Sequence, residues 1–292
     1  MTAEERRAAR RWFQEDFCPS YGVALAVHRE ILHKRTRFQD VLLFENEQWG
    51  KVLVLDGAVQ LTERDEFLYH EALVWPALLY HPEPRHVLIV GGGDGGALEE
   101  VLKFPTVEAV MQVEIDADVV EIAKEHLRSV HRGAYRDPRL RLEIADASEF
   151  LPHDTHKYDV ILMDMSDPIG PSQALYDTIY LAQARKHLRA GGILGMQSGS
   201  ALVRREIFKK VCKTVGGVFP ISRPYAAPVP AYPGGLWTFM LASRNRRALS
   251  AGEAARAVQR LRKLPPPRFV SPGFLRDIAS PPAYLLPTGS KA

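Results

Sequence analysis

The stretch HVLIVGGGDGGALEEVLKF, residues 86–104, decides the fold of this chain. Residues 86–90 form a short, mostly apolar run, which is typical of a strand buried on both faces. A glycine-rich loop at 91–96 interrupts this run, and ALEEVLKF then shows helical spacing. A strand, a glycine loop and a helix in this order indicate the first unit of a nucleotide-binding α/β sheet.

The alternation of strand and helix continues downstream. We predict four more strands, at 107–114, 139–146, 158–164 and 192–198, and a helix at 181–192 that ends at two glycines. Strands that alternate with helices indicate a parallel sheet covered on both faces. Because such crossovers are right-handed, we expect a doubly wound, Rossmann-like sheet. Beyond Asn245 the chain is rich in Arg and Pro and shows little periodicity.

The first 80 residues have a different character. Short segments rich in Leu and β-branched residues alternate with Gly, Asp and Asn, which predicts a small antiparallel sheet. Residues 66–80 place apolar side chains at helical spacing, so we predict a helix there in spite of Pro76. We therefore predict an N-terminal β-rich domain at 1–75 and a nucleoside-binding α/β catalytic domain at 76–292.

Composition excludes several classes of protein. The chain has 292 residues, with 46% hydrophobic and 25% charged residues, which excludes a disordered or fibrous chain. A net charge of +3 is too small to argue for nucleic acid, and the apolar run at 72–80 is too short to span a membrane. Cys18 and Cys212 make neither a zinc site nor a disulfide framework. The first residues have no apolar signal core, so we expect a cytoplasmic protein.

Acidic residues follow the predicted strands. Ligands of an open parallel sheet bind outside the carboxyl ends of its strands, and there the sequence has Asp94, Glu114, Asp146, Asp164 and Asp167. An acid about 20 residues after a glycine loop can bind ribose hydroxyls. Glu114 fits that role, because it lies 114 − 91 = 23 residues after the loop begins.

The glycine loop has three interpretations. In the first, the loop binds a dinucleotide. The pyrophosphate would then lie near Asp94, and the repulsion between two unit charges ~4 Å apart at a dielectric of ~20 costs ~4 kcal/mol. A nucleoside that carries a cation, such as an S-adenosyl sulfonium compound, avoids this repulsion. The third interpretation is a loop that is only a turn.

The acids themselves have two interpretations. Acids at strand ends often cap the following helix, and we expect this of Asp116 and Asp118. Asp94, Asp146 and Asp164 instead gather at one edge without dense Lys or Arg in their segments, which leaves a metal or a cationic substrate to neutralise them.

Of a metal and a cationic substrate, an amine substrate is the better interpretation of these acids. The histidine pairs at 28 and 33, 81 and 86, and 153 and 156 lack ligand spacing and are expected on the surface. The loop DMSDPIGP, residues 164–171, can hold two carboxylates fixed between its prolines, although it is also readable as a turn with surface acids.

Seven pieces of the sequence together resemble the spermidine synthases, the family of polyamine aminopropyltransferases. They are FQD (38–40), VLDGAVQLTERDEFLYHE (54–71), VLIVGGGDGG (87–96), VEID (113–116), Asp146-Ala147, DMSDPIGP (164–171) and AYPGGLWTFMLAS (231–243). The resemblance implies a small N-terminal β domain on a methyltransferase-type α/β domain, assembled as homodimers or homotetramers. It also implies transfer of the aminopropyl group of decarboxylated S-adenosylmethionine, a co-substrate, to an amine. No metal or other cofactor is expected, nor a nucleic-acid or membrane partner.

The resemblance also assigns roles to individual residues. The donor contacts would be Gln39, Gly92, Asp94, Glu114, Asp146, Ala147 and Pro171. Among them Glu114 would bind the ribose, Asp146 and Ala147 the adenine side, and Pro171 would pack near the adenine. The amine contacts would be Tyr69, His70, Asp94, Asp164, Asp167, Tyr232 and Trp237. Asp164 would be the catalytic proton acceptor.

Two departures from the family pattern affect the acceptor. Met165 stands where the family usually has Ser or Thr, and Gly199 stands where an acid is common, which would widen the amine end. Putrescine is the first choice of acceptor, with agmatine, cadaverine or a triamine as alternatives.

Two other functions remain open. One is an S-adenosylmethionine-dependent methyltransferase on the same fold. The other is a non-catalytic protein that binds nucleic acid through Arg6, Arg7, Arg10 and Arg11, although we expect these to form a solvated helix face.

Overall fold

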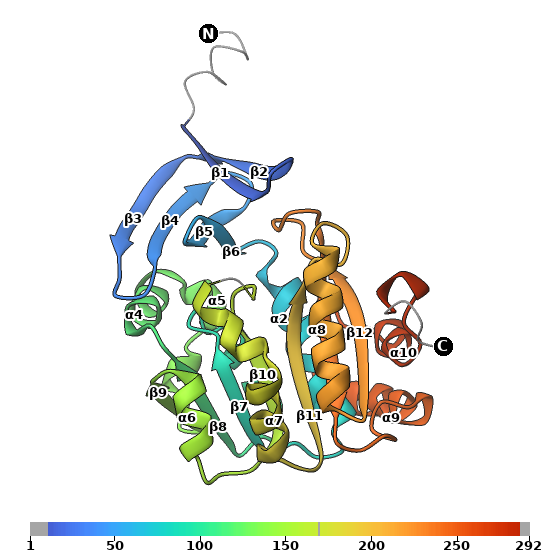
Figure 1. Cartoon of the computed structure of the whole chain (residues 1–292). Coiled ribbons are helices and arrows are strands. Elements are labelled where there is room, and N and C mark those ends of the chain that lie inside the picture. Colours follow the sequence, from blue (N-terminus) through green and yellow to red (C-terminus); the bar gives the residue numbers. More distant parts are fainter. Residues whose placement is uncertain (1–10, 169, 287–292) are drawn as a thin grey trace.

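The N-terminal part of the chain forms two small antiparallel sheets. The computed structural model describes residues 11–168 and 170–286, without the side chain of Pro171. The first sheet pairs β1 (Arg11–Cys18) with β2 (Tyr21–Val27). The second has the order β3 (Arg29–Arg35), β4 (Asp40–Asn46), β5 (Gly50–Leu55) and β6 (Ala58–Thr62). Both sheets, blue in Figure 1, lie over one end of the larger central sheet.

The central sheet has seven strands in the order β12-β13-β11-β10-β7-β8-β9. Their bounds are β7 (His86–Gly91), β8 (Ala109–Glu114), β9 (Leu140–Ile144), β10 (Tyr158–Asp164), β11 (Leu188–Gly199), β12 (Ile221–Pro228) and β13 (Leu236–Ser243). β13 runs antiparallel to both neighbours, whereas β11, β10, β7, β8 and β9 are parallel. The seven residues between β12 and β13 allow a hairpin but are too few for a parallel crossover. The predicted doubly wound α/β class is confirmed, with this antiparallel strand added.

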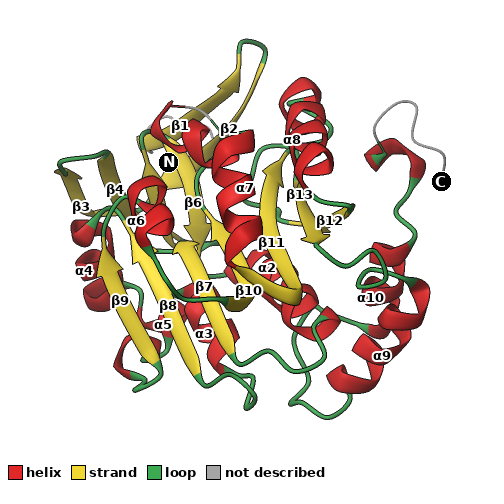
Figure 2. Ribbon diagram, turned by 60° about the horizontal axis from the view of Figure 1, so that its bottom comes forward, coloured by secondary structure: helices red, strands yellow, loops and turns green. Residues whose placement is uncertain are grey.

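Helices cover both faces of the central sheet (Figure 2). They are α2 (Glu66–Tyr80), α3 (Gly96–Leu102), α4 (Ala117–His126), α5 (Arg128–His131), α6 (Ala147–His153), α7 (Thr178–His187), α8 (Arg205–Val218), α9 (Ala251–Leu261) and α10 (Pro272–Ala279). The short 3-10 turns η1 (Ala134–Arg136), η2 (Gly170–Tyr176) and η3 (Ala283–Leu285) complete the helical elements. Alternate side chains of β7 enter different cores: Val87 and Ile89 pack with α2, while Leu88 and Val90 pack with α7. Residues 87–90 of β7 are therefore all apolar, because both faces of the strand are buried there.

Helix α2 connects the two parts of the molecule. It spans residues 66–80 as predicted, includes Pro76, and buries nearly all of its side chains. The domain division after residue 75 stays a prediction. Helix α2 crosses that position, and the change from antiparallel sheets to the central sheet takes place between β6 and β7.

Two segments differ from the sequence prediction. Residues 188–192 do not end the helix at 181–192 but begin β11, because Leu188 pairs with Tyr158 and is buried in the sheet. The chain beyond Asn245 forms helices α9 and α10, which start at the capping residues Ser250 and Ser271. The buried face of α9 includes two alanines among its four buried residues, a weak apolar signal in sequence.

Two predictions for charged residues were also wrong. Arg11 lies in strand β1, not on a helix, and its guanidinium is 2.7 Å from Glu30 Oε2. Arg6, Arg7 and Arg10 lie outside the described residues. His81 was expected on the surface but is 7% exposed, with Nε2 4.0 Å from Asp159 Oδ1. In the described part of the chain, no helix combines the length and the apolar character needed to cross a membrane.

Candidate functional site

A cavity of ≈ 580 Å³ opens where the carboxyl ends of the central strands meet the N-terminal sheets. Its lining includes twelve of the thirteen residues that the sequence analysis selected: Gln39, Tyr69, His70, Gly92, Asp94, Glu114, Asp146, Ala147, Asp164, Asp167, Tyr232 and Trp237. The thirteenth, Pro171, lies in η2, and its side chain falls outside the description. The acids are therefore gathered around one cavity and are not scattered.

The glycine loop at 91–96 packs closely against β10 and α2. Gly91 has φ +84°, and a Cβ there would lie 2.1 Å from the carbonyl oxygen of Asp164. A Cβ at Gly96 would lie 2.1 Å from the ring of His70. Glycine is needed at both positions, because any side chain would push β10 or α2 away from the loop.

One end of the cavity has the features expected for a nucleoside. Glu114 ends β8 and is 8% exposed, and burial raises the pKa of its carboxyl to about 7. Its Oε1 accepts a hydrogen bond from the backbone amide of Asp116, at 3.0 Å. Gln39 reaches the same place from the N-terminal sheet, and its Nε2 donates to Asp116 Oδ2 at 2.9 Å. The N-terminal part thus forms one wall of this end.

Helix caps account for part of the acidic edge. Asp116 caps α4 as predicted, whereas Asp118 lies in the first turn of that helix and pairs with Lys34 at 2.8 Å. Asp146 is also a cap: its Oδ1 accepts from the backbone amide of Ser148 at 2.8 Å at the start of α6. Asp146 therefore combines the two interpretations, since it caps a helix and lines the cavity.

Asp164 lies at the centre of the cavity wall, at the end of β10. Its Oδ1 accepts a hydrogen bond from the hydroxyl of Tyr69 at 2.9 Å. Its Oδ2 is buried and has no hydrogen-bond partner among the described residues. Burial, together with the charge of Asp94, raises the pKa of Asp164 to about 6. This carboxylate has one free oxygen and is a stronger base than an ordinary aspartate.

His70 lies beside these acids as a buried cation. Its Nδ1 is 2.7 Å from Glu66 Oε2, and its Nε2 is 3.3 Å from Asp94 Oδ1. Burial alone would lower the pKa of His70, but Asp94 and Glu66 raise it well above its usual value. Burial likewise opposes ionisation of Asp94, yet the charge and hydrogen bond of His70 lower the pKa of that carboxyl. Asp94 is therefore ionised and His70 protonated.

The same residues have the spacing of a metal site. One ligand atom each from His70, Asp94 and Asp164 lie within 4.8 Å of one another. A protonated imidazole has no lone pair to offer a metal ion, because both nitrogens carry hydrogen. The residues therefore fit an organic cation, which donates hydrogen bonds to carboxylates, better than a metal.

Aromatic rings extend from Asp164 toward the other end of the cavity. The ring centroids of Tyr69 and Tyr232 are 5.8 Å apart, and those of Tyr232 and Trp237 are 4.8 Å apart. The indole Nε1 of Trp237 donates to Gln197 Oε1 at 3.2 Å. This wall can cover the methylene chain of an amine.

The sequence analysis missed several residues of the site. Glu66 had a usable signal, since it lies four residues before His70 on a predicted helix. Glu15, Phe17, Gln197 and Arg204 also line the cavity, and nothing in their local sequence pointed there. Arg204 matters most, because its Nη1 is 2.9 Å from Asp167 Oδ2. The arginine that pairs with Asp167 therefore comes from a segment remote in sequence, which the segments of the acids do not reveal.

The comparisons with known proteins agree with this geometry. The family model described as spermine/spermidine synthase domain matches residues 66–250, and that of the spermidine synthase tetramerisation domain matches residues 11–63. Two curated relatives are named polyamine aminopropyltransferase. The one from Shouchella clausii is 37% identical over 91% of this chain and 98% of its own length. The one from Bacillus subtilis is 36% identical over 83% of this chain and 88% of its own.

Solved structures of the same type match the fold. A spermidine synthase in complex with the transition-state analogue AdoDATO has a TM-score of 0.88 and 29% identity, covering 94% of this chain and 93% of its own. The spermidine synthase from Thermotoga maritima has a TM-score of 0.84 and 28% identity over the same shares. The chain therefore belongs to the spermine/spermidine synthase family and is a transferase of the polyamine aminopropyltransferase type.

Proposed function

We propose that this enzyme transfers the aminopropyl group of decarboxylated S-adenosylmethionine to putrescine. The products are spermidine, 5′-methylthioadenosine and a proton. The observation that carries the proposal is the buried Oδ2 of Asp164, which has no hydrogen-bond partner in the part of the chain that the structure describes. It belongs to a cavity with nucleoside features on one side and an aromatic wall on the other. Agmatine, cadaverine or a triamine are the alternative acceptors.

The donor is bound, in this proposal, at the end that contains Glu114. Glu114 accepts hydrogen bonds from the ribose hydroxyls, which favour its ionised form on binding. Asp146 and Ala147 contact the adenine side with Pro171, while Gln39 and Gly92 complete the donor contacts. Asp94 faces the aminopropyl ammonium and the sulfonium, an arrangement that suits an acid kept ionised by His70.

The acceptor amine must lose a proton before it attacks. A primary amine has a pKa near ~10, so it arrives as an ammonium ion that has no lone pair. Asp164 takes this proton on Oδ2, and its raised pKa makes the transfer easier than for an ordinary aspartate. The nitrogen then forms a bond to the methylene carbon that is attached to the sulfonium sulfur. The bond between that carbon and sulfur breaks, and its electrons stay on sulfur, which becomes a neutral thioether. Much of the rate comes from alignment of nitrogen, carbon and sulfur.

The remaining cavity residues hold the amine. His70 fixes Asp94, and Asp167, paired with Arg204, lines the cavity further along. The faces of Tyr69, Tyr232 and Trp237 cover the methylene chain and add cation–π attraction of ~0.5–2 kcal/mol each. The reaction needs neither a metal nor another cofactor in this proposal, since the leaving group already carries a positive charge.

Assembly and location are part of the proposal. The match of residues 11–63 to a tetramerisation domain supports a homo-oligomer, and we propose a dimer or tetramer formed through the N-terminal sheets. Light scattering of the purified protein tests this. We also propose a cytoplasmic location, with which the free thiols of Cys18 and Cys212 agree.

A product assay with defined donors and acceptors tests the proposed reaction. The enzyme is incubated with decarboxylated S-adenosylmethionine and, separately, with putrescine, agmatine, cadaverine and spermidine, and the products are identified by mass. We expect 5′-methylthioadenosine and the aminopropylated amine, with the highest kcat/KM for putrescine. S-adenosylmethionine serves as the control donor. Methyl transfer from it, without aminopropyl transfer, would establish the methyltransferase alternative instead.

A further inference from the structure

Arg204 ends the aromatic wall of the cavity. From Trp237 the wall continues to Phe17 of β1, with ring centroids 6.1 Å apart. The guanidinium carbon of Arg204 lies 3.6 Å from the centroid of the Phe17 ring. Since Tyr69 at the start of this wall bonds Asp164, an amine that reacts at Asp164 and extends along the rings points its other end toward Arg204.

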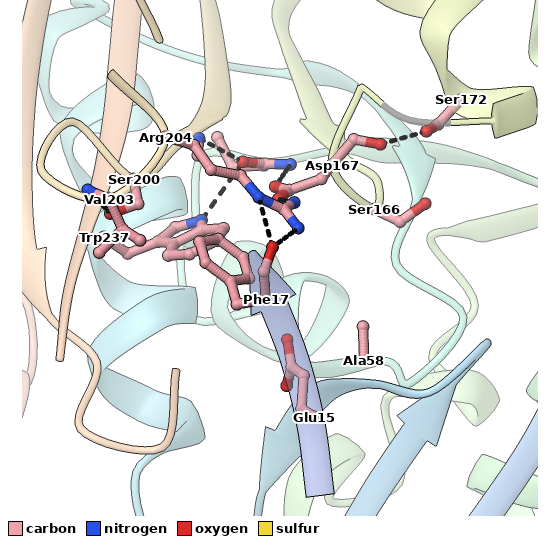
Figure 3. Close-up of polar contacts among 12 residues, drawn as sticks. Glu15, Phe17, Ala58, Ser166, Asp167, Ser172, Ser200, Val203, Arg204 and Trp237 are labelled. Atoms are coloured by element: carbon pink, nitrogen blue, oxygen red, sulfur yellow. Dashed lines mark hydrogen bonds and ion pairs between the residues drawn. The ribbon is translucent and has the colours of Figure 1, made fainter. Parts of the chain in front are cut away.

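Several contacts fix the guanidinium in place (Figure 3). Its Nη1 donates to Asp167 Oδ2 at 2.9 Å, and its Nε donates to the backbone oxygen of Phe17 at 3.2 Å. Nη2 donates to the same oxygen. The backbone amide of Arg204 donates to Ser200 O at 3.1 Å, which anchors the residue at the start of α8. A side chain held by these bonds and by a ring face does not move aside easily for a ligand.

The guanidinium of Arg204 meets the carboxylates of Asp167 and Glu15 at this end of the cavity, and it is paired with Asp167. Asp167 Oδ2 is paired with Arg204, and its Oδ1 accepts from Gln197 Nε2 at a long 3.4 Å. Glu15, a second acid in the lining, is 5% exposed and accepts from the backbone amide of Val59 at 2.9 Å. Gly199 adds no charge, and an ideal Cβ there would lie 3.7 Å from Asp167 Oδ1. One fixed cation thus stands beside the carboxylate that would bind a second ammonium group.

We propose that Arg204 is a specificity-determining residue that makes the enzyme weakly selective for charge at the far end of its acceptor. The inference rests on the proposed aminopropyl transfer. A distal ammonium gains little from a carboxylate that Arg204 already neutralises, and it is repelled by the guanidinium. A primary amine with an uncharged tail does not meet this repulsion. The acceptor class is therefore primary alkylamines, with or without a second charge.

Two acceptors of equal length and different charge test the inference. The ratio of kcat/KM for 1,4-diaminobutane to that for n-butylamine measures selectivity for the distal ammonium. The Arg204→Gln variant removes the cation and frees Asp167, so we expect the ratio to rise about tenfold over the wild type, mainly through a lower KM for the diamine. Arg204→Lys keeps the charge and should leave the ratio close to that of the wild type.

Matched variants separate this role from a structural one. Arg205→Gln is the control, because the neighbouring guanidinium bonds Tyr284 O at 3.1 Å and does not line the cavity. In the Arg204→Gln background, Asp167→Asn should abolish the rise in the kcat/KM ratio, because the freed carboxylate is the group that binds the distal ammonium. Asp167→Asn alone should change the ratio less than about twofold, and this arm holds even if Arg204→Gln folds poorly.

The outcomes distinguish the inference from the proposed function. If the wild type transfers the aminopropyl group to no amine, the proposed function fails. If transfer occurs but the ratio is unchanged or lower in a folded Arg204→Gln variant, the assignment of Arg204 is overturned. A tenfold loss of selectivity in Asp167→Asn alone would overturn it as well, because that acid would then already bind the diamine in the wild type.

Discussion

The two ends of the cavity are built in different ways. The proposed donor end takes Gly92, Glu114 and Asp146 from the carboxyl ends of successive parallel strands, within one sheet. The proposed acceptor end combines a helix, the turn before β13 and two segments far apart in sequence, represented by Phe17 and Arg204. A site made from strand ends depends on the sheet as a whole, whereas a site made from remote segments can change its charge through one residue.

Asp164 lies between the two ends, and its loss should have the largest effect. Asp164→Asn keeps the shape but removes the base, so we expect turnover to fall by a factor of about 10³. Donor binding, measured by calorimetry, should stay within about threefold of the wild type because Asp164 belongs to the acceptor side. Turnover at the wild-type rate would show that another group accepts the proton.

Substitution of Glu114 should have the next largest effect, and it should weaken binding of the donor much more than binding of the amine. Glu114→Gln removes a charged acceptor of the ribose hydroxyls, and hydrogen bonds to charged groups contribute about 1.5–3 kcal/mol. We expect donor affinity to fall roughly tenfold to a hundredfold, with the KM of the amine changed much less. Calorimetry for the donor and steady-state kinetics for the amine provide the two values. A larger effect on the amine would show that the two ends are not separate.

The pH dependence of kcat/KM should test the role of Asp164, which lies between the two ends of the cavity. Asp164 must be ionised to accept a proton, and burial with the Asp94 charge raises its pKa to about 6. The kcat/KM for the amine should therefore fall as the pH drops below about 6 and reach a plateau above it. Tyr69→Phe removes a hydrogen bond that lowers this pKa, so the acidic limb should move to higher pH. An unchanged limb in Tyr69→Phe would assign it to a different group.

Metal removal should have the smallest effect. His70, Asp94 and Asp164 have metal-like spacing, but His70 is held protonated by Glu66 and Asp94. Dialysis against a chelator should leave kcat and KM within error of the untreated enzyme, with Mg²⁺ and Zn²⁺ added back as controls. Loss of activity that a metal restores would reassign the centre from an amine site to a metal site.

The sequence alone determined the frame of the donor end and much of the centre. Buried parallel strands are continuous apolar runs, and in this chain an acidic residue stands at the end of several of them. The strand at 86–90 and the positions of Glu114 and Asp164 at strand ends could therefore be predicted without coordinates. The helix at 66–80 could also be predicted, because the helical spacing of its apolar residues is a local feature of the sequence. The match of seven pieces to one family then supplied roles that spacing alone does not.

Only the tertiary structure decided how the acceptor end is charged. Phe17 and Arg204 are 187 residues apart, and their hydrogen bond leaves no trace in the pattern of either segment. Asp167 likewise meets Arg204 only because the turn after β11 brings Arg204 into the lining of the cavity. The strand start at Leu188 and the alanine face of α9 were also decided by packing. Local periodicity records which face of an element is buried, but not which distant side chain will lie against it.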